Sequence, residues 1–409
     1  MRITDLSIYN YRGASRLEIA LDRRLNVFFG VNGSGKSTVL DATAVVLSAL
    51  ANFFTPDKKG YRPIAEKDVK NGAQQAHIQL DFEYLRNIYG IEFVKDHWQT
   101  NIDQQKKLDA VVKPQVADPT ANLPIFAYYP VNRVVLEIPL EVGDRKDFSR
   151  QEAYEDSIAN AANFKTFFEW FRSREDYENE NYRRNPLEKL DPQLQSVRNA
   201  IEKFIPEFKE LTVRRIPLRM EVTKNGQALR VDQLSDGEKC LLAMIGDIAR
   251  RLAIANPRLT NPLEGEGVIL IDEIDLHLHP TWQYMVIPKL LEVFPNCQFM
   301  ISTHSPHVIT HVPPDQLFVL QMADGNLSAV HPHESYGKNA DRVFEDLMGM
   351  PTTRPEKVKS SLERIYELIS DAKLDSARKN IETLRTEIGD DPELVRATAL
   401  IRRKELVGK

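Results

Sequence analysis

The sequence predicts a mixed α/β fold, in which short buried strands alternate with helices around a sheet. Three observations favour this class. A glycine-rich loop at 30–35 lies between an apolar strand and an apolar helix, the apolar strand at 267–271 ends at two carboxylates, and another strand followed by a polar loop covers 298–306. Alternating strands and helices of this kind are typical of a sheet with helices packed on its faces.

In the first part of the chain, apolar and β-branched segments predict strands at 3–12, 25–29, 76–84 and 123–131. The residues between the first two segments are polar and predict a connection. Apolar residues at helical spacing, without internal Gly or Pro, predict a helix from Ser37 to Phe54. The Lys-, Gln- and Asp-rich stretch from Lys95 to Thr120 indicates a flexible surface excursion.

In the second part, long helical periodicity with many aromatic residues begins at Ser149 and predicts an inserted helical arm. A strand at 219–224 turns through Asn225-Gly226 into 229–231. Further helices are expected at 237–255 and 280–294. Beyond Tyr336, amphipathic helices separated near Asp371-Ala372 and 389–392 predict a small helical tail.

Composition limits the class of protein. The chain has 409 residues, with 54 Lys and Arg against 59 Asp and Glu, and a formal net charge of -5. This balance argues against a polycationic DNA binder but leaves a local basic groove open. The N-terminus lacks the apolar core of a signal peptide, and the uncharged stretch 42–56 is too short to span a bilayer, so we expect a cytoplasmic protein without a membrane partner. With only Cys240 and Cys297, a disulfide framework and a cysteine zinc site are not expected.

The strongest motif is the glycine loop itself. Residues 30–38, GVNGSGKST, fit the pattern G-x-x-x-x-G-K-[S/T] between a strand and a helix. Backbone N–H groups and the start of the helix would cradle phosphate oxygens, Lys36 would reach the β- and γ-phosphates, and the Ser37 hydroxyl would ligate Mg²⁺. A plain Gly-rich turn is the alternative, which the lysine, the hydroxyl and both flanks disfavour. The predicted nucleotide-binding residues of this loop are Asn32, Gly33, Ser34, Gly35, Lys36, Ser37 and Thr38.

A second motif supplies acids. The segment 267–273, GVILIDE, predicts a buried strand that ends at Asp272 and Glu273. Asp272 is expected to hold Mg²⁺, and Glu273, whose side chain points the other way, is expected to polarise an attacking water. The alternative is a solvated acidic turn after a strand, which the phosphate loop upstream disfavours.

Residues 234–239, LSDGEK, lie at the start of the helix expected from Gly237. They resemble the signature loop of the ATP-binding-cassette (ABC) ATPases, commonly L-S-G-G-Q, with Asp236 and Glu238 as departures. The resemblance implies that Ser235, Gly237 and Glu238 face the γ-phosphate of a nucleotide bound by another subunit. As a bare pattern, Ser235 and Glu238 form a helix cap with a capping box, which is the other interpretation.

Two loops that follow strands resemble further elements of the same superfamily. IDLHLHP at 274–280 resembles the D-loop, and ISTHSP at 301–306 resembles the switch-histidine loop. This resemblance implies that His304 contacts the γ-phosphate or helps to fix Glu273 and the water. His277 and His279 are a poor zinc pair, because they are two residues apart and lack a third ligand.

Asn10-Tyr11-Arg12 resembles the N-F-R element of the recombination-repair branch of these ATPases, which implies that Arg12 lies near the nucleotide. A salt bridge at the protein surface is the alternative role for Arg12. Asn132 occupies the slot in which many cassette ATPases carry the Q-loop glutamine.

Taken in order, these motifs resemble ABC-type ATPases over roughly residues 1–330. The resemblance implies an ABC-ATPase head that uses ATP and Mg²⁺ and pairs head to tail around two nucleotides. It divides the chain into a first ATPase lobe with the phosphate loop, an inserted helical arm, a second lobe with the remaining motifs, and a C-terminal helical tail. The expected regions are 1–148, 149–212, 213–335 and 336–409.

The residues that make up these motifs are similar to those in the overcoming-lysogenisation-defect and RecF-like group of bacterial ATPases. With its short arm and the tail sequence YGKNADRVFEDLMGM at 336–350, the chain resembles the PtuA family, the ATPases of the Septu antiphage system and of related retron modules. The resemblance implies a homodimer or higher oligomer that controls an HNH nuclease. No nuclease domain is expected in the chain itself. A RecF-like ATPase that binds DNA and a nucleotide-sensing ATPase without a nuclease partner stay open as alternatives.

Overall fold

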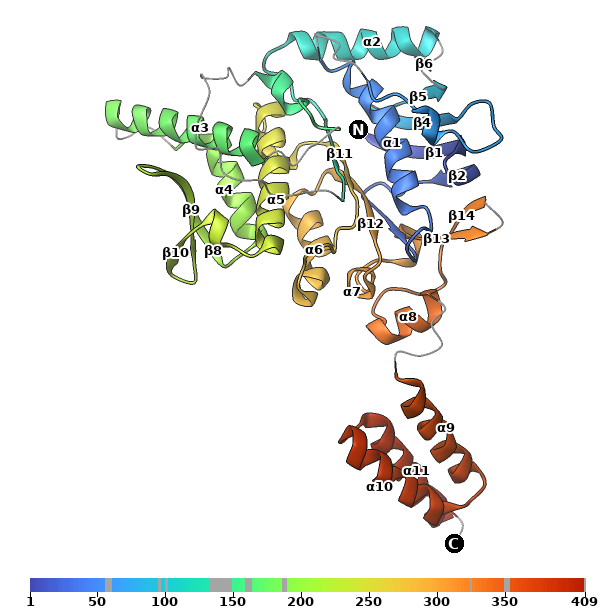
Figure 1. The fold of residues 1–409 in the computed structure, drawn as a ribbon. Coiled ribbons are helices and arrows are strands. Elements are labelled where there is room, and N and C mark those ends of the chain that lie inside the picture. Colours follow the sequence, from blue (N-terminus) through green and yellow to red (C-terminus); the bar gives the residue numbers. More distant parts are fainter. Residues whose placement is uncertain are drawn as a thin grey trace. The chain divides into compact units, whose positions relative to one another are not determined.

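The computed structural model describes residues 1–55, 61–94, 97–99, 102–131, 149–158, 164–185, 190–323, 326–348 and 354–407. The chain divides into two compact units, Met1–Lys338 and Asn339–Lys409. Figure 1 shows the elements of both units. All the motifs predicted to bind or hydrolyse nucleotide fall within the first unit.

A six-stranded sheet forms the centre of the first unit, in the order β14-β13-β3-β12-β11-β7 (Figure 1). All neighbouring pairs are parallel except for the edge hairpin β13–β14. Every residue of β3, β7, β11 and β12 is buried, as expected for parallel strands covered on both faces. The strands are β3 Leu25–Phe29, β7 Ile125–Tyr129, β11 Gly267–Ile271, β12 Cys297–Thr303, β13 Leu317–Ala323 and β14 Asn326–Val330.

Helix α1, Lys36–Ala51, packs against this sheet and against a second, antiparallel sheet. The second sheet has the order β2-β1-β4-β5-β6. Because α1 contacts both sheets, it is buried nearly all round, which explains why it is apolar on every side. The strands of the second sheet are β1 Arg2–Tyr11, β2 Ala14–Ala20, β4 His77–Tyr84, β5 Asn87–Val94 and β6 His97–Gln99.

Two predictions for the first part of the chain are wrong. The polar connection expected after the first strand contains the edge strand β2, whose buried Leu17 and Ile19 alternate with exposed Arg16 and Glu18. The expected surface excursion at 95–120 contains helix α2, Ile102–Ala117. In α2 the few apolar side chains that are buried, such as Leu108 and Val112, stand one helical turn apart among charged residues.

The region expected as an arm contains α3, Phe164–Arg184, and α4, Pro192–Phe204, and both helices pack on α5, Asp236–Ala255. A Cβ atom placed on Gly246 of α5 would lie 2.8 Å from the Phe167 ring, so α3 and α5 approach closely. The three-stranded sheet β10-β9-β8 adjoins these helices, and Asn225-Gly226 makes the turn between β9 and β10, as predicted. Its strands are β8 Phe208–Arg215, β9 Leu218–Lys224 and β10 Gln227–Arg230.

In the second unit, α8, Ala340–Met348, precedes three helices that share a hydrophobic cluster of their own. Their boundaries agree with the breaks predicted at 371–372 and 389–392. Within the described residues of the whole chain, no helix combines the length and the apolar character that crossing a bilayer requires. The three helices are α9 Glu356–Ser370, α10 Leu374–Ile388 and α11 Pro392–Val407.

Candidate functional site

The glycine loop connects β3 to α1, the order that the sequence predicted. Gly33 and Gly35 have φ values of 79° and 97°, which L side chains rarely adopt, so the loop needs glycine at both positions. Asn32 and Gly33 are exposed at the tip, Ser37 is half-buried, and Ser34, Lys36 and Thr38 are buried. The tip of the loop is therefore open to solvent, and the buried residues Ser34, Lys36 and Thr38 form its floor.

The Lys36 ammonium lies on that floor. Its Nζ atom donates to the carbonyl oxygens of Gly30, at 2.9 Å, and Val31, at 3.0 Å. Burial lowers the pKa of Lys36, although the negative charges of Glu273 and Asp272 act to raise it. The lysine, the predicted metal ligand Asp272 and the predicted catalytic acid Glu273 thus share one electrostatic site.

The Ser34 hydroxyl also belongs to this floor. It is 1% exposed, and its oxygen has no hydrogen-bond partner in the structure. A buried O–H group without an acceptor is costly, and a phosphate oxygen is the kind of acceptor that a glycine loop presents to it. The loop therefore fits a nucleotide phosphate chemically.

The predicted acids lie at the end of β11. The Asp272 N–H donates to the carbonyl of Tyr129 on the neighbouring strand β7, at 2.9 Å. The Ser302 hydroxyl, at the end of β12, donates to the Asp272 carboxylate and accepts from the Glu273 N–H at 2.7 Å. One buried serine thus fixes both acids, leaving Asp272 buried and the Glu273 side chain 24% exposed.

His304 lies within reach of two carboxylates. Its Nδ1 atom is 4.0 Å from Glu273 Oε1, and its Nε2 atom is 3.5 Å from Asp275 Oδ2. The Thr303 hydroxyl donates to Asp275, so the switch loop and the loop after β11 are held together. His304 therefore stands beside Glu273.

The signature residues cap helix α5. The Ser235 hydroxyl and N–H donate to the Glu238 carboxylate, at 2.8 and 2.9 Å, and Lys224 forms an ion pair with the same carboxylate. This is the capping-box arrangement. Ser235 is exposed and Gly237 is buried. The first turn of α5 therefore presents Ser235 to solvent.

Gly237 lies against the loop that resembles a D-loop. A Cβ atom at this position would come 2.4 Å from the backbone carbonyl oxygen of His277. Only glycine allows that approach, because a backbone atom cannot move aside as a flexible side chain can. The signature turn and the loop after β11 are thus in direct contact within one chain.

Arg12 is held by carboxylates. Its guanidinium donates to Asp41 on α1, at 2.6 Å, and to Asp68, at 2.8 Å. The salt-bridge role named above for Arg12 therefore has a concrete geometry, and a role at the nucleotide stays a prediction.

Several residues at the site were not singled out from the sequence. Ser302, Thr303 and Asp275 stand within the segments 274–280 and 301–306, where only His304 was chosen for chemistry. The sequence signal that could have identified the two hydroxyls was their position, side by side at the end of the buried strand β12, whose neighbour β11 ends in acids. Asn132 lies outside the described residues, and within them no three His, Cys, Asp or Glu side chains group to hold a metal ion.

Several known proteins are similar in sequence to this chain. The family described as "AAA domain, putative AbiEii toxin, Type IV TA system" matches residues 25–310. The "Retron Ec83 probable ATPase" of Escherichia coli is 30% identical, over 96% of this chain and 85% of that protein. The "Septu protein PtuA" of Bacillus thuringiensis is 23% identical, over 86% of this chain and 85% of that protein.

Among solved structures, the SMC head domain from Thermotoga maritima aligns with a TM-score of 0.45 and 15% identity, over 82% of this chain and all of that one. The family match covers well over half of the chain, and it includes the glycine loop, the signature turn, the acids and His304. The chain belongs to this AAA-domain family, and it is an ATPase of the ABC type related to the retron ATPases and to the Septu protein PtuA.

Proposed function

We propose that the chain hydrolyses ATP to ADP and phosphate at a site that two copies build together. The observation that carries this proposal is that the phosphate-loop lysine and the acids Asp272 and Glu273 follow strands β3 and β11, which flank β12 in one parallel sheet. A lysine placed there holds the phosphates, while the acids act on the metal and on water.

On the nucleotide side, Lys36, the Ser34 hydroxyl and the loop N–H groups would bind the phosphates. Ser37 and Asp272 would hold Mg²⁺, which neutralises charge that develops on the transferred phosphoryl group. The hydrogen bond from Ser302 orients the Asp272 carboxylate at the end of β11.

On the water side, Glu273 is the candidate general base. Its backbone has a φ of 47°, a conformation that L residues rarely adopt, and the Ser302 hydroxyl accepts from its N–H. The backbone turn at Glu273 separates its side chain from that of the buried Asp272. His304 stands beside the Glu273 side chain and would hold Glu273 and the attacking water in place.

The second copy would supply Ser235 and the N-terminus of α5 to the γ-phosphate. Ser235 is exposed, and the first-turn N–H groups of α5 form the positive end of a 20-residue helix. With one chain supplying Lys36 and Glu273 and the other Ser235, ATP would hold the pair closed, and phosphate loss would reopen it.

Two substitutions test the hydrolysis proposal. Lys36→Ala should abolish nucleotide binding in a fluorescent-ATP titration. Glu273→Gln should bind ATP, lower turnover by at least about a hundredfold and accumulate an ATP-bound dimer in size-exclusion chromatography. Wild-type turnover by the Glu273→Gln protein would refute the role of Glu273.

We further propose that this ATPase acts in antiphage defence and controls an HNH nuclease. The resemblance to the PtuA family supports this role, together with a C-terminal unit that has its own hydrophobic cluster and its own surface. The three helices of that unit are the proposed nuclease dock. Deleting 355–409 should abolish co-purification with a co-expressed HNH nuclease that the full chain retains, and unchanged co-purification would eliminate the docking proposal.

Direct DNA binding is the second candidate. Residues 208–230, which contain β8 to β10, carry six basic and two acidic side chains, in a chain whose net charge is -5. Ile216, at the tip of the β8–β9 hairpin beside Arg214 and Arg215, is 94% exposed. Each of the six basic side chains is paired with a carboxylate in the structure, so DNA phosphates would have to displace these carboxylates. The exposed apolar tip suits insertion into the DNA minor groove. Binding of duplex DNA that weakens steeply with salt, and is lost in Arg214→Gln, would favour this candidate.

The third possibility is a nucleotide sensor. A protein that hydrolyses ATP but neither binds DNA nor retains a nuclease in those two assays would fit a nucleotide-sensing ATPase.

A further inference from the structure

Two consecutive tyrosines end strand β7. Tyr128 is 3% exposed and Tyr129 is fully buried. Because neighbouring residues of a strand point to opposite faces of a sheet, the two side chains leave the sheet in opposite directions. Their hydroxyl groups end at two different helices, α1 and α5.

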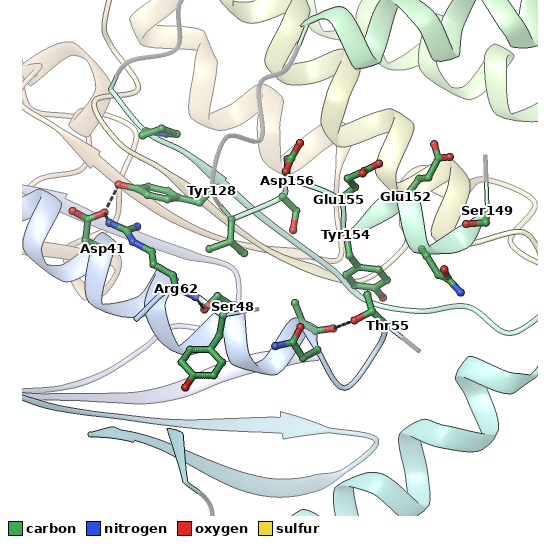
Figure 2. Close-up of a pocket in the computed structure, with 17 residues that line it drawn as sticks. Asp41, Ser48, Thr55, Arg62, Tyr128, Ser149, Glu152, Tyr154, Glu155 and Asp156 are labelled. Carbon is green, nitrogen blue, oxygen red and sulfur yellow. Dashed lines mark hydrogen bonds and ion pairs between the residues drawn. The ribbon is translucent and has the colours of Figure 1, made fainter. Parts of the chain in front are cut away.

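On one face, the Tyr128 hydroxyl donates to Asp41 Oδ1 at 3.0 Å. Asp41 belongs to α1, five residues after Lys36 in the sequence. Arg12 and Arg62 hold the same carboxylate, at 2.6 and 2.9 Å. Figure 2 shows Tyr128 and Arg62 at Asp41, on one side of a cavity of about 860 Å³. A tyrosine, an aspartate and two arginines thus tie β7 to the helix of the phosphate loop.

The other face has the same composition. The Tyr129 hydroxyl donates to Asp247 Oδ2 at 2.8 Å, and Arg250 and Arg251 hold that carboxylate at 2.8 and 2.7 Å. Asp247, Arg250 and Arg251 are each 1% exposed. Asp247 lies on α5 about three helical turns beyond Ser235. This second cluster ties β7 to the signature helix.

The strand between the two clusters, β7, also contacts Asp272 at the end of β11. The Tyr129 carbonyl accepts from the Asp272 N–H at 2.9 Å, and Tyr129 is paired with Ile271 in the parallel register of β7 and β11. The end of β7 therefore contacts the phosphate-loop helix, the metal-binding acid and the signature helix.

We propose that Tyr128 and Tyr129 are positioning residues that hold α1, α5 and Asp272 in one register, so that nucleotide bound at Lys36 alters the signature helix of the same chain. This inference rests on the proposed ATP hydrolysis. It adds the path by which nucleotide bound at the phosphate loop would affect the signature helix.

Physical reasons support tyrosine at both positions. A buried carboxylate needs every available donor, and a network with two arginines and one phenol has few alternative arrangements. Burial and the neighbouring aspartates raise the pKa of both phenols, so the two hydroxyls remain donors at neutral pH. A shift of α1 would therefore be passed to α5 rather than absorbed in the core.

The test removes the two hydroxyls one at a time. Tyr129→Phe and Tyr128→Phe keep the ring and delete only the hydrogen bond. Each should lower kcat about tenfold while KM for ATP stays within about threefold of wild type, because binding at Lys36 is untouched. Tyr84→Phe is the matched control. Tyr84 is also buried, and its hydroxyl donates to Gln115 of α2 at 3.1 Å, so this hydrogen bond joins neither α1 nor α5 to β7. It should leave kcat unchanged.

Hydrogen exchange supplies a readout that does not need turnover. In wild type, MgATP should slow amide exchange in 244–255, the half of α5 that carries Asp247, and Tyr129→Phe should lose most of that protection while still binding ATP.

Unchanged kcat and unchanged protection in Tyr129→Phe would overturn the proposal, as would an equal loss of kcat in Tyr84→Phe. If Tyr129→Phe fails to fold, Tyr128→Phe on the opposite face must give the kcat loss and the exchange loss, and its failure to do so overturns the proposal. A wild type that binds ATP without hydrolysing it contradicts the hydrolysis proposal alone, because the exchange result still decides the inference.

Discussion

At the residue scale, the catalytic end of the sheet depends on small hydroxyl groups as much as on the acids. Ser302 is fully buried and serves Asp272 and the Glu273 N–H together, and Thr303 serves Asp275. The motif order predicted Asp272, Glu273 and His304 from the sequence. It did not predict these hydroxyls, because a pair of hydroxyl residues at the end of a buried strand becomes informative only when the neighbouring strand is known to end in acids.

Ser302→Ala tests this arrangement. The substitution removes the hydrogen bond from Ser302 to the Asp272 carboxylate and the one that Ser302 accepts from the Glu273 N–H. It should cost about 1–3 kcal/mol of unfolding free energy and lower kcat at least about tenfold. Thermal denaturation and steady-state ATPase assays measure both effects. Ser335→Ala is the control, since Ser335 is equally buried and bonded to the Val312 carbonyl in another part of the unit. Equal kcat losses in both variants would contradict a specific role for Ser302.

At the element scale, helix α5 shows how one turn can be both a cap and a candidate ligand. The capping box predicted from Ser235 and Glu238 is confirmed, and it places Ser235 in solvent at the helix N-terminus. Sequence spacing predicted this local structure because capping depends on neighbouring residues. It did not predict the contact of Gly237 with His277, which joins segments 40 residues apart.

Gly237→Ala should push the first turn of α5 away from the His277 carbonyl. Overpacking against backbone costs about 1–3 kcal/mol, so the melting temperature should fall and ATPase activity should drop with it. Asp236→Ala, at an exposed position of the same turn, provides the control and should change neither. Wild-type stability of Gly237→Ala would show that the contact is not tight.

The Glu238 carboxylate predicts a pH effect. Burial acts to raise its pKa, but the Lys224 ammonium and the Ser235 N–H and hydroxyl outweigh burial and hold it below the ordinary 4.5. A lowered pKa stabilises the fold above the unfolded value, and that stability is lost as pH falls through the folded value. Glu238→Gln should therefore flatten the acid limb of the stability curve between about pH 5 and pH 3. An unchanged acid limb would contradict the lowered pKa.

The missed elements have physical causes. Strand β2 is an edge strand with Arg16 and Glu18 on its solvent face, and helix α2 buries too few side chains to show helical periodicity in its charged sequence. The buried pair Arg250 and Arg251 was equally unexpected, because neighbouring arginines on a helix are normally solvated. Asp247 on the same helix and the Tyr129 hydroxyl make their burial tolerable, together with the carbonyls of Ala153 and Glu155, which accept from Arg251.

At the whole-molecule scale, the division into Met1–Lys338 and Asn339–Lys409 separates nucleotide chemistry from the C-terminal helices. Every predicted site residue lies in the first unit, and the second has its own hydrophobic cluster. The sequence predicted the helical tail because amphipathic helices with clear breaks are readable locally. The sequence of one chain does not predict which copy contributes residues to which nucleotide site, because that depends on the surface through which two copies pair rather than on a sequence motif.

The fragment 1–338 should therefore fold and bind ATP with an affinity within about threefold of the full chain. Circular dichroism and a fluorescent-ATP titration measure this. Lys36→Ala in the same fragment is the control for specific binding. Loss of folding on removing 339–409 would contradict the independence of the two units.

The central claim is that one copy supplies Lys36 and Glu273 while its partner supplies Ser235, and mixing two inactive variants tests it most directly. Lys36→Ala and Ser235→Arg should each be inactive when purified alone. In a hybrid of the two, one site combines the intact phosphate loop of one copy with the intact Ser235 of the other, so the mixture should regain a substantial fraction of wild-type ATPase activity. No recovery in hybrids whose formation is confirmed by tagged co-purification would contradict a site shared between two copies.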